Sequence, residues 1–95
     1  MSEILDISRE LKEELDKLPL FIEFKRVKAL YDSNPELREL KKNIVRAKNE
    51  NRMDDYNKFK SEFDINPLVS NYLTLKEEVE NYLREVSKEI QKWFT

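Results

Sequence analysis

Residues 66–94 read NPLVSNYLTLKEEVENYLREVSKEIQKWF and contain the longest uninterrupted apolar periodicity of the chain. Their apolar side chains recur at steps of three and four residues, which is the spacing of one face of an α-helix. Asn66 can cap the first amides of such a helix, and Pro67 suits its first position because proline has no N–H to satisfy and a helical φ. The pattern therefore predicts one long C-terminal helix.

A helix over this stretch is roughly 40 Å long, whereas a compact domain of this size is about 30–35 Å across. We therefore expect its C-terminal end, with Trp93 and Phe94, to extend beyond the core of its own chain. Large aromatic side chains seldom remain in water without a partner, which favours a homodimer formed through this end. The residues expected at the dimer interface are Leu75, Val79, Tyr82, Val86, Ile90, Trp93 and Phe94.

Composition restricts the fold class. The chain has 95 residues, of which 40% are charged, and it contains no glycine. Without glycine, tight β-hairpins and phosphate-binding loops lose the residue that tolerates positive φ or a close backbone approach. We therefore predict an all-α fold in a single domain over residues 1–95: an antiparallel bundle of four to five helices with a long C-terminal helix, which dimerises.

Proline and asparagine mark the expected helix boundaries. The first segment places Ile7 and Leu11 on one face, and it ends or bends at Pro19, where a second helix begins. Asn34 is expected to cap a third helix at the following proline. The polar stretch at residues 49–55 leaves two alternatives: a break, with Asn51 at the C-terminal cap and Asp54 capping a fourth helix, or one continuous helix whose apolar face rotates. We favour the break.

The inventory of reactive groups argues against an enzyme. With no His and no Cys, nucleophile–base dyads and the common zinc sites are excluded, so we expect no catalytic, metal or cofactor-binding residue. The net charge is −2 with both signs interspersed, which argues against a nucleic-acid or membrane surface. The small basic cluster of Lys25, Arg26 and Lys28 is the one candidate site for binding RNA phosphates. No signal peptide and no apolar run near 20 residues is present, so a cytoplasmic protein is expected.

Several short motifs occur in a characteristic order. Phe21-x-x-Phe24-Lys25 is followed by Val27, Leu30 and Tyr31, by Asn34-Pro35-Glu36-Leu37, by a polar middle, and by Asn66-Pro67-Leu68-Val69. In order and spacing, over nearly the whole chain, they resemble the YlbF/YmcA family of small helical bacterial regulators. The resemblance implies a dimer-forming, non-enzymatic protein of Gram-positive-type bacteria. Characterised members act in complexes that influence competence, sporulation and biofilm development, and they are linked to RNA processing through ribonuclease Y.

Two features depart from this family. Some members carry cysteines that are associated with an iron–sulfur cluster, and because this chain has no cysteine the cluster is not carried over. The middle turn also lacks the glycine found in many relatives, so the geometry between the third and fourth helices does not follow from the resemblance.

Two functional classes are favoured over a third, an enzyme or direct nucleic-acid binder. The first is a protein–protein adaptor or regulator that works as a homodimer and presents a helical face to a larger partner, which by resemblance is a ribonuclease Y-type complex. The second is a purely structural oligomerisation module. A retained non-self partner would distinguish the adaptor from the module.

Overall fold

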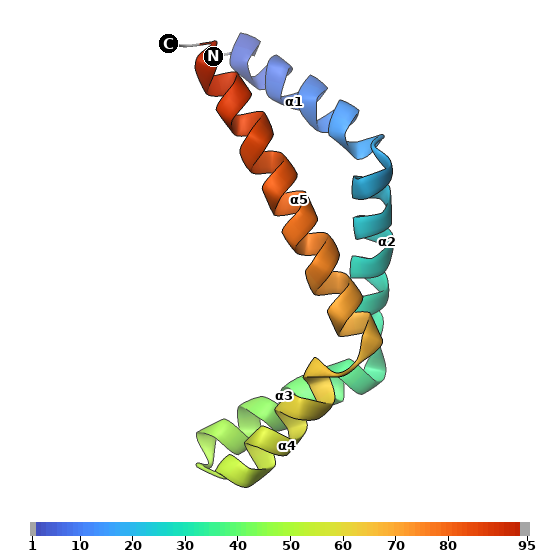
Figure 1. Ribbon diagram of the computed structural model, residues 1–95, viewed down its shortest axis with the longest axis vertical. Helices are drawn as coiled ribbons and strands as arrows, with labels where there is room; N and C mark the ends of the chain where they lie inside the picture. The colour runs from blue at the N-terminus through green and yellow to red at the C-terminus, as the bar shows by residue number, and fades with distance from the viewer. Residues whose placement is uncertain (1, 94–95) are drawn as a thin grey trace. The chain divides into compact units, whose positions relative to one another are not determined.

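The computed structural model describes residues 2–93, without the side chains of residues 2, 4 and 5. This part of the chain forms five helices: α1 (Ser2–Asp16), α2 (Pro19–Ser33), α3 (Pro35–Asn49), α4 (Met53–Asp64) and α5 (Pro67–Lys92) (Figure 1). The predicted all-α class and the long C-terminal helix are confirmed. At 26 residues, α5 is roughly 39 Å long.

Asparagine side chains start two of the helices as predicted. The Asn34 side-chain oxygen accepts a hydrogen bond from the N–H of Leu37 at 3.0 Å, and proline occupies the first turn of α3. At the start of α5, the Asn66 side-chain oxygen accepts from the N–H of Leu68 at 2.9 Å. Each cap satisfies an amide that has no partner inside its helix, which marks the point where the helix begins.

The polar stretch breaks the helix, as favoured from the sequence. Asn51 adopts a left-handed conformation with a φ of 58°, a position that glycine usually fills. Its N–H donates to the carbonyl of Lys48 at 3.2 Å, and the N–H of Arg52 donates to the carbonyl of Ala47 at 2.8 Å. These two bonds form a Schellman motif, in which asparagine replaces the missing glycine.

The predicted role of Asp54 as the cap of α4 is wrong. The Schellman motif ends at Arg52, which becomes the N-cap residue and makes no side-chain cap hydrogen bond. Asp54 consequently lies inside the first turn with Asp55, where carboxylates favour the positive end of the helix dipole. The Arg52 guanidinium binds the Asp55 carboxylate at 2.9 Å and thereby ties the turn to α4.

The helices are distributed over two compact units. Unit 1 contains residues Met1–Arg26 and Leu75–Thr95, and unit 2 contains Val27–Thr74, so α2 and α5 each contribute to both. The single domain over residues 1–95 stays a prediction.

The core of unit 2 is built around an antiparallel hairpin of α3 and α4, which lie side by side (Figure 1). Leu37, Leu40 and Val69 are buried there, and partly buried side chains pack against them: Tyr31, Phe59, Phe63 and Leu68. The ring of Tyr31 stacks on that of Tyr72 with 4.2 Å between centroids. Tyr72 is half-buried in this unit.

In unit 1, α1 and the C-terminal part of α5 run in opposite directions, so the start of α1 and the end of α5 lie at the same end of the unit (Figure 1). Phe21 and Val79 are its buried apolar side chains, with 8% and 7% of their surface exposed. The rings of Phe21 and Tyr82 pack edge to face, with 5.8 Å between their centroids. An ion pair between Lys25 and Asp16 at 2.7 Å joins α2 to α1, and this hydrogen bond lowers the pKa of Asp16.

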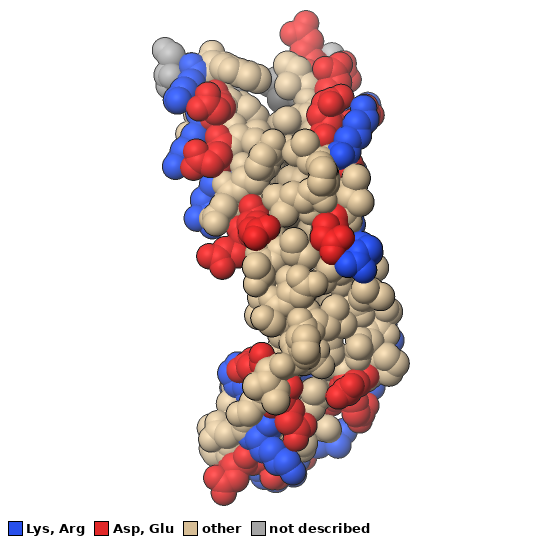
Figure 2. Space-filling view, turned by 45° about the vertical axis from the view of Figure 1, so that its right-hand side comes forward, with Lys and Arg blue, Asp and Glu red and all other residues tan. Residues whose placement is uncertain are grey.

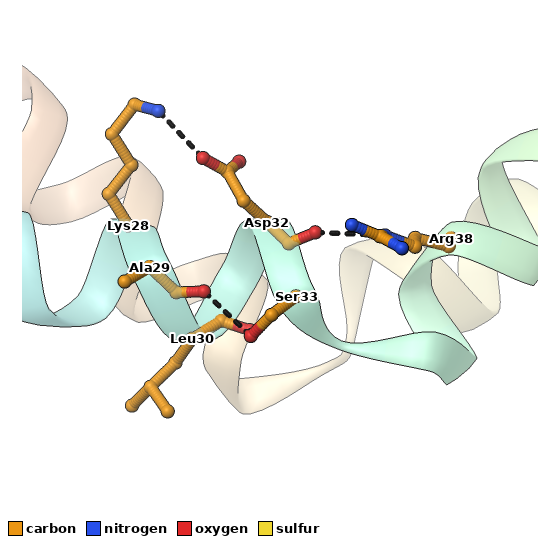
Figure 3. A network of polar contacts seen from close by, with 6 residues as sticks. All are labelled: Lys28, Ala29, Leu30, Asp32, Ser33 and Arg38. Carbon is orange, nitrogen blue, oxygen red and sulfur yellow. Dashed lines mark hydrogen bonds and ion pairs between the residues drawn. The ribbon is translucent and has the colours of Figure 1, made fainter.

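Polar contacts hold the corner between α2 and α3 (Figure 3). The Lys28 ammonium lies 2.7 Å from the Asp32 carboxylate, and the Arg38 guanidinium donates to the backbone carbonyl of Asp32 at 3.0 Å. The Ser33 hydroxyl donates to the carbonyl of Ala29 at 2.8 Å, one turn earlier in α2. The hydrogen bond from Lys28 lowers the pKa of Asp32 below its ordinary value of 3.8.

Lys28→Met should raise the pKa of Asp32 back towards 3.8, because the ammonium that stabilises the carboxylate is removed. Because the pKa of Asp32 is lower in the folded state, its carboxylate stabilises the folded protein at a pH above 3.8. This contribution is lost as the pH falls through the lowered folded-state pKa. NMR titration of the Asp32 carboxyl measures the shift, with Lys88→Met as the matched change elsewhere. An unchanged Asp32 titration in Lys28→Met would contradict this contact.

Candidate functional site

An apolar groove lies between α1 and the C-terminal part of α5 in unit 1, and it encloses about 490 Å³. The residues that line it are Ile7, Leu11, Tyr82, Glu85, Val86, Glu89, Ile90 and Trp93. Figure 2 shows uncharged surface between charged side chains of both signs in this part of the chain. Because two helices supply the walls, the groove has the form that receives a helix or a large side chain.

Large apolar side chains in this groove are open to solvent. Trp93 is 71% exposed, Ile7 55% and Tyr82 39%. The α5 wall extends from Tyr82 to Trp93, a rise of about 16 Å, which equals about three helical turns. On a small protein, a contiguous exposed apolar surface of this kind usually marks an interaction site.

The charged groups at the groove edge are already compensated. Glu85 lies 3.3 Å from the ammonium of Lys88, and Glu89 lies 3.0 Å from that of Lys92. Both pairs are exposed, and in each pair the two partners lie about one turn apart on α5. The negative charges of Glu85 and Glu89 are therefore largely balanced beside the groove. The groove therefore favours an apolar partner over a cation.

The structure distributes the predicted interface residues over different environments. Tyr82, Val86, Ile90 and Trp93 come together as the α5 wall of the groove. Leu75 is half-buried, and Val79 is covered within its own chain. Phe94 lies outside the described residues. The dimer interface formed by these side chains stays a prediction.

Sequence reasoning missed the second wall of the groove. Ile7 and Leu11 were assigned to the apolar face of the first helix, but that face was not connected with the C-terminal stripe. Their spacing of four residues was a valid signal for an apolar face, but it carries no information about which helix lies opposite.

The basic cluster predicted on α2 is held in ion pairs in the described structure. Among residues 2–93, no group of three His, Cys, Asp or Glu side chains is placed to hold a metal ion. The three residues of the basic cluster on α2 are each bound to a carboxylate: Lys25 to Asp16, Arg26 to Glu23 and Lys28 to Asp32. These ion pairs leave the cluster without free cations for phosphates. None of the described helices is long and apolar enough to cross a membrane.

Comparison with known proteins gives one family match. The model of the family described as control of competence regulator ComK, YlbF/YmcA, matches residues 4–93. No curated protein and no solved structure matches the chain. The matched range contains all but the first two residues of α1 and the whole of α2 to α5. The chain therefore belongs to the YlbF/YmcA family of competence-control regulators.

Proposed function

We propose that this protein is a non-enzymatic regulatory adaptor that acts through protein–protein interaction as a homodimer. The observation that carries the proposal is the groove between α1 and α5, whose lining is apolar and whose largest side chain, Trp93, is 71% exposed. Membership of the YlbF/YmcA family supports a role related to the control of competence.

A second copy of the chain suits the groove well. The C-terminal part of α5 presents Val86, Ile90 and Trp93 on one face, and these side chains both line the groove and could enter that of a partner. In a dimer with twofold symmetry, the same surface on each subunit contacts its counterpart, so one such stripe is sufficient for both halves. Burial of Trp93 there would remove the largest exposed aromatic of the described chain from water.

Light scattering tests the homodimer. At micromolar concentration we expect a mass of twice the 11.6 kDa of one chain. Val86→Glu should shift the protein towards the monomer, because it places an unpaired charge in the apolar groove. Ile22→Glu is the matched control, since Ile22 is 55% exposed and does not line the groove. A monomeric mass for the unmodified chain would contradict the dimer.

The adaptor role requires a larger partner in addition to the dimer. By resemblance this partner is a ribonuclease Y-type complex in the bacterial cytoplasm. Affinity purification from native cells should retain a non-self protein at a fixed stoichiometry. Recovery of the chain with only itself would favour the oligomerisation module and contradict the adaptor.

A further inference from the structure

Helix α3 carries an unusual concentration of basic side chains. They are Arg38, Lys41, Lys42, Arg46 and Lys48, and no carboxylate occurs between residues 40 and 49. In the part of the chain that the structure describes, none of the five forms an ion pair with a carboxylate, whereas each of the other four helices has at least one basic residue that does. With Glu36 and Glu39 as its only acidic residues, α3 carries a net positive charge, and its five basic side chains form no ion pair with a carboxylate among the described residues.

Three of these side chains form a row opposite the core. Leu37, Leu40 and Ala47 are buried on one side of α3, and Arg38, Lys42 and Arg46 follow one another at steps of four on the other side. Successive members of the row are about 6 Å apart along the helix axis. Val45 lies beside the row and is 57% exposed. Together with Lys41, these residues form what we call the α3 basic face: Arg38, Lys41, Lys42, Val45 and Arg46.

Two carboxylates lie at the edges of the α3 basic face: Asp32, which pairs with Lys28 and also interacts with the charges of Lys41 and Arg38, and Glu39, which forms no ion pair among the described residues. The Lys41 ammonium lies over the ring of Tyr31, 4.0 Å from its centroid, and Arg38 donates to a backbone carbonyl. Glu50 lines the shallow depression beside Lys42 and Arg46, but its carboxylate is bound by the Arg52 guanidinium at 2.8 Å. Lys42 and Arg46 thus remain available as cations next to an exposed apolar side chain.

We propose that the α3 basic face binds an acidic amphipathic helix of a partner protein. A helix with Glu at positions i, i+4 and i+8 repeats its carboxylates at the same spacing of about 6 Å as Arg38, Lys42 and Arg46. An apolar residue beside those carboxylates would cover Val45. A nucleic-acid backbone offers phosphates but nothing apolar for Val45, and the net charge of −2 opposes an extended polyanion.

The surface is separate from the groove of the proposed function. All residues of the α3 basic face belong to unit 2, and all residues that line the groove belong to unit 1. Substitutions on α3 can therefore remove the acidic helix while the dimer mass stays unchanged, so failure of one proposal does not imply failure of the other.

Fluorescence anisotropy with the full chain tests the proposal. The probe is a labelled helical peptide with Glu at i, i+4 and i+8 and Leu beside each Glu. Its reference has the same composition, with the Glu residues spread around the helix. We expect preference for the patterned peptide, a loss of affinity of at least about tenfold in Lys42→Glu/Arg46→Glu, and a loss of about threefold in Val45→Ala.

The matched control is Lys58→Glu/Arg84→Glu, which makes the same change of charge at two exposed basic residues of α4 and α5. Equal loss in this control would overturn the proposal, because net charge alone would then explain binding. Absence of peptide binding would also overturn it. So would tight binding of a single-stranded RNA that depends on Lys42 and Arg46 but not on Val45, since the face would then be a phosphate site.

Discussion

Leu37→Ala is expected to lower the free energy of unfolding by about 2–5 kcal/mol, the range for truncation of a buried leucine. Leu37 is completely buried, and it lies in the core cluster with Leu40 and Val69. Small domains are stable by only about 5–15 kcal/mol, so this single change removes a large share of the total. For a chain of this length the melting temperature should fall by at least about 8 °C.

Thermal and denaturant unfolding measure this effect, with Ile65→Ala as the matched control. Ile65 is 79% exposed, so its truncation should change the free energy of unfolding by less than about 0.5 kcal/mol. A loss in Leu37→Ala no larger than that in Ile65→Ala would contradict the description of the unit 2 core.

Trp93→Ala is expected to weaken the proposed homodimer by about 30-fold or more in Kd, the effect of losing an interface residue worth at least about 2 kcal/mol. Trp93 is 71% exposed in the single chain, so its truncation removes little from the subunit itself. The midpoint of unfolding should consequently depend more steeply on protein concentration in Trp93→Ala than in the unmodified protein.

Tyr72→Ala should behave differently, because Tyr72 is stacked on Tyr31 inside unit 2. Its melting temperature should be lower at every protein concentration, with no change in the dimer Kd. Sedimentation analysis over a dilution series separates the two variants. If Trp93→Ala left the dimer Kd unchanged but abolished binding of a co-purified protein, the end of α5 would be the partner site and not the dimer contact.

The sequence alone determined most of the helix boundaries of this protein, because local interactions decide them. Asn34 and Asn66 each cap a helix that opens with proline, and Asn51 accepts the left-handed conformation that ends α3. These asparagines interact with residues only a few positions away in the sequence, so their effect can be predicted without knowledge of the fold. The error at Asp54 was a shift within one turn, since the cap depends on where the Schellman motif ends.

Tertiary structure alone decided which helix faces meet and which charges remain uncompensated. Periodicity identified the stripe that contains Tyr82 and Trp93, but only the fold placed Ile7 opposite it to form the groove. Likewise, Lys25 was a candidate cation until the corner between α1 and α2 brought Asp16 to 2.7 Å, whereas Lys42 has no carboxylate partner among the residues that the structure describes. The physical reason is that a helix displays its side chains according to its own sequence, while their burial or pairing depends on residues that the folded chain brings near from elsewhere.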